Sequence, residues 1–441
     1  MGYQDRYKAR FNHDLSPGSY SRTNQESRFV RPARAFARQL RLRQNAMMPS
    51  ETQLLPTKQI TTQNLIFALL CGGFIVNGII ITFIGPILPF FKSKWHLDDG
   101  HAGLFFITQF IGSFVGVLGS SALVPAKGFK PAITLGLFMM GVGFALFDAP
   151  YYALALAASV FFGVGYGLMT PGTNLWVAES YGERRASALN VANLAWGVGA
   201  TSCSWLVLLA IHTHHIDGLL YAVGAACCAL GLVLLRLPFG QAPQRGGNAD
   251  AGSAGLTALG VAALLGVLFF VYVGTENAIS GWAAAHAKRA AAWNSNAWIL
   301  APTFFFGGLL GGRAAGAAIL LRLSETTVAV GGLLLAGFGD FTFLSAETWP
   351  VLFVGAFFAG LGLSSVYPIF IAWLSKWFGP RARSVGGVLF ALASLGGAAM
   401  PPLVGVVSRA TQSLRFGLLV PFAGCAAMLI VIALLRPGGR G

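Results

Sequence analysis

Two charged residues stand out within long apolar stretches of the chain, where a charge is costly and therefore indicates a function. Glu276, with Asn277 beside it, lies near the outer end of its stretch. It could bind a proton or a sugar hydroxyl there, because a carboxylate in a dry cavity holds a proton more readily than one in water. A solvated acid at a helix end is the alternative. Arg313 is flanked by glycines and could either contact an anionic group or extend its side chain to the membrane surface.

Amides and tryptophans in other apolar stretches offer the groups that bind hydroxyl-rich solutes. An amide can both donate and accept hydrogen bonds, as a sugar hydroxyl does. Asn190 and Asn193 are three residues apart and therefore share one face of a helix. The same amides could instead join neighbouring helices, and Trp282 could be an anchor at the membrane interface. The predicted substrate-binding residues are Asn77, Gln109, Asn174, Asn190, Asn193, Trp196, Asn277 and Trp282.

A cluster of charges between two apolar stretches predicts a gate. Glu179 and Glu183 lie near Arg184 and Arg185, and Arg381 occupies the matching place in the second half of the chain. Exposed ion pairs contribute little to stability. We therefore expect these pairs to act in switching, by breaking when a cavity opens toward the cytoplasm.

No pattern in the sequence predicts catalysis, a metal site or a cofactor. The G-x-S-x-G and H-E-x-x-H motifs and a phosphate-binding Gly-Lys-Ser/Thr loop are absent from the sequence. The tract 212–217 holds three histidines and an aspartate, but their spacing fits no rigid metal site.

Asp148 and Asp340 are predicted to be solvated residues at helix ends. The five cysteines all fall inside apolar stretches and read as small hydrophobic residues.

The elements that carry these residues are predicted to be membrane-spanning helices. The 441 residues are 55% hydrophobic and only 10% charged, so most of the surface must face lipid. Backbone groups in lipid must be bonded within their own segment, which favours helices of about 20 residues. The twelve predicted spans are 64–90, 101–124, 131–149, 152–178, 187–211, 218–236, 255–278, 296–320, 327–344, 350–374, 385–408 and 415–436.

The formal charge of +15 is explained by topology rather than by nucleic acid binding. With the amino terminus in the cytoplasm, lysines and arginines concentrate on the inner side, as the positive-inside rule requires. We expect both termini to be cytoplasmic and no nucleic acid to bind. The predicted parts are a disordered basic tail 1–60, a first six-helix bundle 61–236, a linker 237–254, a second six-helix bundle 255–436 and a short tail 437–441.

The two halves repeat each other at an offset of 197 residues. Gly163 matches Gly360, Pro171 matches Pro368 and Trp176 matches Trp373, and further glycine, arginine and serine pairs follow the same offset. Composition alone would hardly align proline and tryptophan as well as glycine. Parallel six-helix repeats are a transporter architecture, in which the solute site lies near the bilayer midplane between the halves.

Five segments carry a recognisable pattern: "GPILPFF" at 85–91, "GVGYGLMTPGTN" at 163–174, "NVANLAWGVGA" at 190–200, "YVGTENAISGW" at 272–282 and "GLGLSSVYPIFIAWLSKWFG" at 360–379. Through these segments the sequence resembles the major facilitator superfamily over roughly residues 60–436, and within it the fucose-permease-like sugar carriers. The resemblance implies an all-α membrane fold of twelve helices, whose two six-helix bundles rock about a central cavity.

Three features depart from the pattern that the resemblance implies: the pair of carboxylates, the loop between the second and third spans, and an amide of the fifth span. Gly85 and Met169 occupy the places of the family's two protonatable carboxylates, and the loop 119–130 lacks the usual aspartate. Asn193 matches a sugar-binding glutamine and keeps the amide, one carbon shorter.

The function predicted from the sequence is secondary transport of a small polar solute by alternating access. A monosaccharide is the leading solute, carried with protons or uncoupled. Export of a drug or metabolite is the alternative within transport, and a polytopic membrane enzyme or a nontransporting receptor lies outside it. The expected setting is the lipid bilayer of the inner or plasma membrane, with the chain a monomer and without a cofactor.

Overall fold

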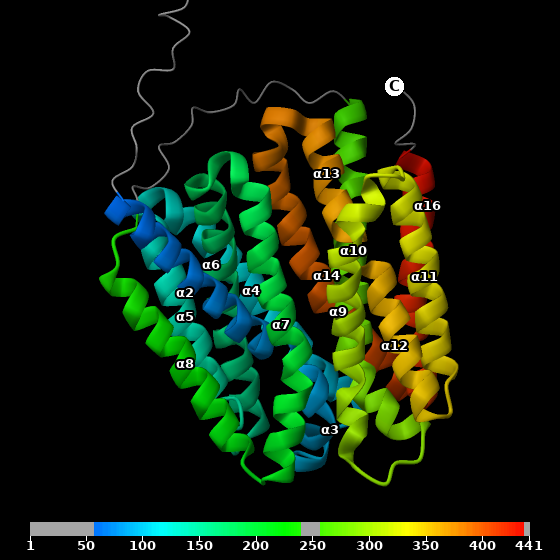
Figure 1. Ribbon diagram of the computed structural model, residues 1–441. Helices are drawn as coiled ribbons and strands as arrows, with labels where there is room; N and C mark the ends of the chain where they lie inside the picture. The colour runs from blue at the N-terminus through cyan, green and yellow to red at the C-terminus, as the bar shows by residue number, and fades with distance from the viewer. Residues whose placement is uncertain (1–56, 240–255, 436–441) are drawn as a thin grey trace, which may run out of the picture. The chain divides into compact units, whose positions relative to one another are not determined.

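The computed structural model describes residues 57–239 and 256–435, and every regular element in these two ranges is helical (Figure 1). Most of the predicted basic tail and linker, and the residues after 435, lie outside the described residues. The predicted all-α architecture is confirmed.

The first half of the chain forms six predicted spans, of which the first is interrupted. Pro86 lacks an N–H and its ring collides with the carbonyl four residues earlier, at Thr82, so the helix breaks there. The helices are α2 (Thr57–Thr82), α3 (Ile84–Lys94), α4 (Asp99–Lys127), α5 (Phe129–Ala145), α6 (Tyr152–Ser180), α7 (Arg185–His212) and α8 (Ile216–Arg236).

The second half repeats this arrangement, and its fourth span is also interrupted by a proline. Pro368 meets the carbonyl of Ser364 in the way that Pro86 meets that of Thr82, and α12 ends just before, at Leu363. The helices are α9 (Leu256–Ala290), α10 (Ala301–Leu320), α11 (Glu325–Ser345), α12 (Trp349–Leu363), α13 (Val366–Phe378), α14 (Ala382–Thr411), α15 (Leu414–Gly417) and α16 (Leu419–Leu435).

Apolar length supports the membrane assignment. Eleven segments of the described residues are long and apolar enough to cross a bilayer, with α2 joined to α3 and α12 to α13. The shorter apolar helix α5 makes the twelfth span.

The helix crossings repeat at the offset seen in the sequence. A Cβ atom on Gly163 of α6 would lie 2.2 Å from the carbonyl oxygen of Gln109 in α4. The matching Cβ on Gly360 of α12 would lie 1.9 Å from the carbonyl oxygen of Phe305 in α10. Backbones approach this closely only where a side chain is missing. The matched glycines are therefore the contact points of equivalent helix pairs.

The turn after the fourth span also repeats. Gly182 begins a short 3-10 turn with φ +47°, and Gly379 begins its counterpart with φ +48°. A Cβ atom at either position would meet nothing within 4 Å. Glycine is needed at both places for the left-handed backbone conformation rather than for space.

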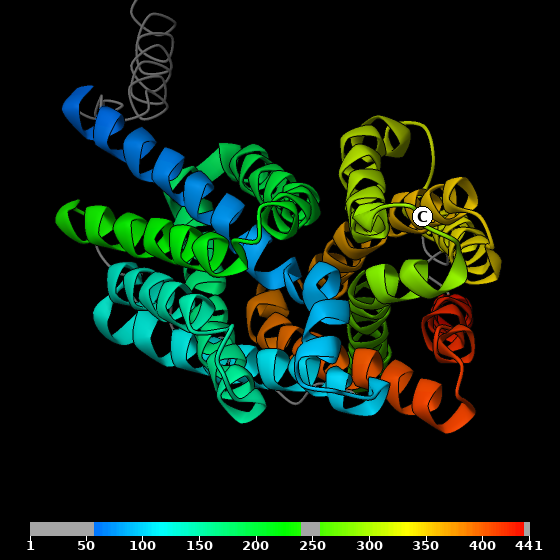
Figure 2. The ribbon, with the colours of Figure 1, turned by 90° about the horizontal axis from the view of Figure 1, so that it is seen from below.

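The two bundles, α2–α8 and α9–α16, meet along a seam. A Cβ on Gly103 of α4 would lie 3.0 Å from the Cα atom of Pro402 in α14, and one on Gly85 of α3 would lie 2.8 Å from the Ser280 carbonyl of α9. We call the end where α8 stops and α9 starts the linker end, and the opposite one the clamp end. Figure 2 views the molecule from the clamp end, with α3 between the bundles.

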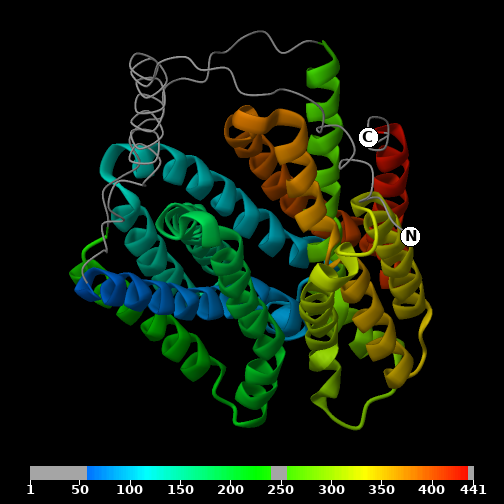
Figure 3. The ribbon, with the colours of Figure 1, turned by 45° about the horizontal axis from the view of Figure 1, so that its top comes forward.

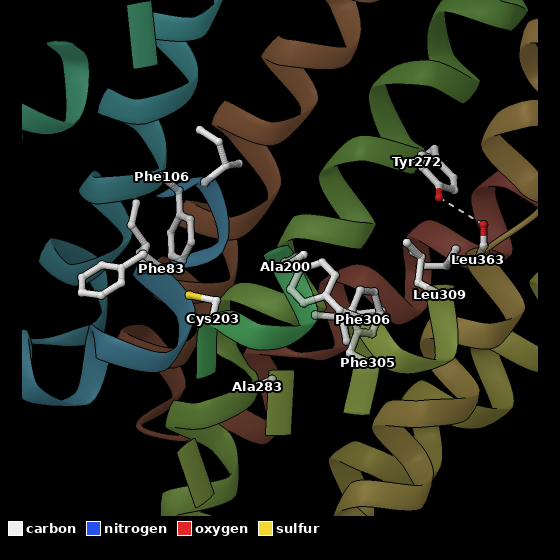
Figure 4. Packing of buried hydrophobic residues seen from close by; sticks show 14 of the residues in the cluster. Phe83, Phe106, Ala200, Cys203, Tyr272, Ala283, Phe305, Phe306, Leu309 and Leu363 are labelled. Carbon is white, nitrogen blue, oxygen red and sulfur yellow. Dashed lines mark hydrogen bonds between the residues drawn. The ribbon is translucent and has the colours of Figure 1, made fainter. Parts of the chain in front are cut away.

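Toward the linker end the bundles diverge. Figures 1 and 3 show α6 and α7 standing apart there from α13 and α14. Nearer the clamp end, large apolar side chains fill the space around the seam (Figure 4). Phe106 of the first bundle packs against Trp282 of the second, and Phe306 of the second bundle packs against Trp196 of the first.

Candidate functional site

Glu276 lies in the middle of α9 rather than near its end. The prediction stopped the seventh span at residue 278, but the helix continues for about three more turns to Ala290. The added segment is rich in alanine, which has the highest helix propensity. The predicted position of Glu276 near the outer end of its span is therefore wrong, the alternative of a solvated acid at a helix end does not hold, and the side chain is half-buried within a span.

Polar side chains from both bundles surround Glu276. The carboxylate interacts electrostatically with Arg313 of α10, and the Tyr272 hydroxyl lies within hydrogen-bond reach of it. Tyr272 also donates to the carbonyl oxygen of Leu363 at 3.1 Å (Figure 4). Tyr166 of α6 interacts with Glu276 from across the seam. This group, which we call the seam cluster, comprises Tyr166, Trp196, Tyr272, Glu276, Arg313 and Tyr367.

The three tyrosines were not predicted as site residues. Tyr166 lies between two glycines in its helix, and Tyr367 precedes the proline that interrupts the tenth span. Interrupted helices within a membrane often lie at the binding site of a transporter. That signal could have found Tyr367, but nothing in the sequence separates Tyr166 from a packing residue.

Arg313 faces the first bundle. Its guanidinium carbon lies 5.9 Å from the ring centroid of Trp196 in α7, and that ring packs edge-on against Phe306. The Nε atom is buried without a hydrogen-bond partner. Within the described residues Arg313 forms no hydrogen bond and no ion pair. Its positive charge therefore interacts only with the Trp196 ring and, at longer range, with groups such as the Glu276 carboxylate.

Asn77 and Gln109 are buried inside the first bundle. Asn77 donates to the Thr170 hydroxyl at 2.9 Å, and Gln109 donates to the Ile81 carbonyl at 3.3 Å. Each amide therefore joins two helices, which is the alternative use that the sequence left open. Each also retains a buried carbonyl oxygen without a partner.

Asn190 and Asn193 lie on the face of α7 that turns toward α10. They precede Gly197 by two turns and by one turn, and a Cβ on Gly197 would lie 2.7 Å from Leu310 of α10. Both asparagines are exposed. The Asn193 amide donates to the carbonyl oxygen of Leu189 at 2.8 Å, which leaves its own oxygen free to accept.

The remaining predicted amides and Trp282 differ in accessibility. Asn174 is half-buried with an unpartnered oxygen, and half-buried Asn277 donates to its own helix at Val273. Trp282 is 0% exposed and donates to the Pro401 carbonyl at 2.8 Å. It packs between the bundles in this conformation and presents no ring face to a solute.

A charged network that the sequence did not predict closes the clamp end. Asp99 at the start of α4 accepts hydrogen bonds from Arg289 of α9 at 2.8 and 2.6 Å and from the Ser408 hydroxyl of α14 at 2.6 Å. Lys92 of α3 pairs with the same carboxylate. We call these four residues the clamp. Its only sequence signal was an aspartate pair at a helix start opposite basic residues.

Asp98 adds a second pair beside the clamp. Its carboxylate lies 3.3 Å from Nε of Arg409 in α14. The backbone N–H of His101 donates to the same carboxylate and lowers the pKa of Asp98 below its usual value. The clamp end thus carries two acidic residues of the first bundle bonded to the second.

A comparison of the chain with family models identifies its relatives. The model described as Major Facilitator Superfamily matches residues 70–328, more than half of the chain. The chain belongs to the Major Facilitator Superfamily. Its members are transporters and not enzymes, so this chain is a multi-pass integral membrane transporter.

Individual relatives of this major facilitator transporter are distant. An uncharacterized MFS-type transporter of Yersinia pestis is 23% identical over 365 residues, covering 81% of this chain and 91% of the relative. The L-fucose-proton symporter of Escherichia coli is 29% identical over 142 residues, which cover 30% of this chain and 32% of the symporter.

Solved structures share the fold of this transporter. A D-xylose-proton symporter superposes with a TM-score of 0.69 at 14% identity, covering 86% of this chain and 97% of that chain. The E. coli fucose:proton symporter gives 0.61 at 19% identity, covering 85% and 99%. The predicted fold of two six-helix bundles is confirmed.

Asp340 of this transporter is buried, whereas the sequence predicted a solvated position. It was expected to be solvated at a helix end, but it is 0% exposed within α11 and both carboxylate oxygens lack a hydrogen-bond partner. That expectation is wrong, because Asp340 lies more than a turn before the end of α11 and is buried where α11 packs closely on neighbouring helices. Asp148 does lie near the surface, where it pairs with Lys94.

The predicted gate residues of this transporter lie at the linker end. Glu179, Arg184, Arg185 and Arg381 are all exposed near the ends of α6, α7 and α13. Their part in gating stays a prediction. Among the described residues, no group of three histidine, cysteine, aspartate or glutamate side chains is placed to hold a metal ion.

Proposed function

We propose that this major facilitator transporter carries a hydroxyl-rich solute of monosaccharide size together with a proton, by alternating access. The observation that carries the proposal is the seam cluster. Five of its six members are half-buried, and they come from helices of both bundles. Polar groups inside a membrane are costly and persist where they serve transport.

Solute binding is assigned to the seam cluster and to the neighbouring amides of α7. Tyrosine hydroxyls and asparagine amides can donate and accept, as sugar hydroxyls do. Asn190 and Asn193 are exposed on the seam face of their helix. The 29% identity over 142 residues to an L-fucose-proton symporter supports a sugar.

Proton binding is assigned to Glu276. The two places where the resemblance implies carboxylates hold Gly85, which packs on α9, and Met169, which is fully buried. Glu276 is the acid of the seam cluster, and it faces Arg313 and three tyrosines. Neutralising it by a proton would change the charge of the site as the transporter changes state.

Alternating access follows from bonds that join the bundles at one end. Asp99 ties α4 to α9 and α14 at the clamp end, while the bundles diverge at the linker end. We assign the linker end to the cytoplasm, because Arg184, Arg185 and Arg381 lie there. One chain supplies both sides of the seam, so we expect a monomer in the cell membrane.

Counterflow into proteoliposomes tests this function. Purified protein is loaded with unlabelled monosaccharide, and uptake of labelled monosaccharide is followed with and without an inward proton gradient. We expect saturable exchange without the gradient and accumulation with it. Exchange without any accumulation would remove proton coupling, and no exchange across a set of sugars and sugar acids would remove the sugar assignment.

A further inference from the structure

Arg313 has a charge that no side chain of the described residues neutralises by contact. We propose that it binds an anionic group of the solute, so that the substrate class is a sugar acid, a polyol that bears one carboxylate. This inference rests on the proposed function, because it assumes that the solute lies at the seam cluster. It adds the chemical feature that would separate this solute from neutral monosaccharides.

The side chains around Arg313 offer the face of an aromatic ring but no hydrogen-bond acceptor. The Trp196 ring, 5.9 Å from the guanidinium carbon, attracts the positive charge by a cation–π interaction. A ring face cannot satisfy the five N–H donors of a guanidinium group. The buried Nε has no partner at all. A carboxylate from a solute would supply two acceptor oxygens in the geometry that arginine matches best.

Glu276 does not take the place of that carboxylate. It interacts electrostatically with Arg313, but the two side chains form neither an ion pair nor a hydrogen bond. Once Glu276 holds a proton, Arg313 is left as the charge of the cluster. A solute carboxylate would then neutralise it, so that proton and anion cross the bilayer together with no net charge.

The direction of the Arg313 side chain argues against snorkelling. Thr303, Phe306, Leu310 and Arg313 lie on one face of α10, and each contacts α7 of the other bundle. The guanidinium group follows this face across the seam to Trp196. A side chain that served only to reach the membrane surface would point toward the end of α10 instead.

The hydroxyls of the same solute have partners close by. Asn193 precedes Trp196 by three residues on α7 and is exposed. Tyr367 interacts electrostatically with both Arg313 and Glu276. The carboxylate would thus be bound from the second bundle, and the ring hydroxyls from both bundles, which would couple binding to the approach of the bundles.

Counterflow with matched solutes tests the inference. Glucuronate, gluconate and glucose are compared at equal concentration in wild type, in Arg313→Gln and in Arg313→Lys. We expect wild type to exchange at least one of the two acids about tenfold faster than glucose. Arg313→Gln should lose this preference, and Arg313→Lys should keep part of it, because lysine provides the charge without the planar fork. Arg322→Gln, an exposed arginine just beyond α10, is the control and should behave as wild type.

The outcomes separate the two proposals. Preferential exchange of glucose in wild type would overturn the sugar-acid inference and leave the proposed function standing. No exchange of any of the three solutes would count against both. Because the wild-type preference is measured without a variant, the test survives if Arg313→Gln fails to fold. Thermal unfolding of each variant by tryptophan fluorescence shows whether it has folded.

Discussion

Asp99 of α4 accepts hydrogen bonds from both terminal nitrogens of Arg289 in α9, at 2.8 and 2.6 Å, and thereby joins the two bundles through one carboxylate. Its side chain is only 8% exposed. Removal of one partner from a buried pair is costly because the other charge is left unpaired. The clamp therefore stabilises the conformation seen here, and any conformation open at the clamp end must do without it.

Asp99→Asn is expected to favour opening at the clamp end. The substitution removes the negative charge from Lys92 and from Arg289, which is 41% exposed, and should cost about 1.5–3 kcal/mol in the clamped state. The measurement is labelling of Ser280→Cys by a membrane-impermeant thiol reagent, in a background without the native cysteines. Ser280 is 6% exposed in the clamped state, so its labelling rate should rise at least tenfold.

Asp148→Asn is the matched control for the clamp. It breaks the pair with Lys94 at the same end of the molecule, but both residues belong to the first bundle. Labelling of Ser280→Cys should stay as in the parent. Equal labelling in the two variants would show that the clamp does not hold the bundles together.

Glu276→Gln is expected to separate accumulation from exchange. Glutamine keeps the size and polarity of the side chain but cannot release a proton. Accumulation driven by a proton gradient should fall to the level of the gradient-free reaction, while counterflow should stay within about tenfold of wild type. Parallel loss of both activities would assign Glu276 to solute binding, and loss of neither would exclude it from coupling.

Much of the fold could be predicted because lipid restricts the choices. Apolar length marks eleven of the spans in the described residues, and the matched pair Gly163 and Gly360 marks the same helix crossing in each half. The one large error concerns α9: the predicted span ends at residue 278, just after the polar residues Thr275–Asn277, whereas the helix continues to Ala290. Apolar length does not distinguish a polar run that lines a seam from one that leaves the membrane.

The site was less predictable than the fold. Glu276 and Arg313 stood out because charge is rare in a span, and the structure brings them together. Asn77 carried the same kind of signal but bonds Thr170 inside its own bundle. Which face of a helix turns toward the seam depends on packing between bundles. The clamp was missed for the same reason, since Asp99 and Arg289 are 190 residues apart.

Gly360→Ala is expected to destabilise the protein strongly. The new Cβ would lie 1.9 Å from the Phe305 carbonyl oxygen, so α10 and α12 would have to separate. Overpacking of this kind costs about 1–3 kcal/mol or more. Gly331→Ala in α11 is the control, because its Cβ meets nothing within 4 Å and alanine is the better helix former. Thermal unfolding in detergent should show a lower midpoint for the first variant only, and a midpoint unchanged by Gly360→Ala would contradict the crossing described here.

Asp340→Leu is expected to stabilise the protein without loss of transport. Gly339 packs on the Ala359 backbone as Gly143 packs on that of Phe162, so Asp340 occupies the place that Phe144 fills in the first bundle. An apolar side chain suits such a site, and removal of two unpartnered carboxylate oxygens should gain about 1–3 kcal/mol. Asp340→Asn keeps a polar group and should gain little. The measurements are the thermal unfolding midpoint and the counterflow rate of both variants. If Asp340→Asn folds but does not transport, Asp340 takes part in the transport cycle and the prediction is wrong.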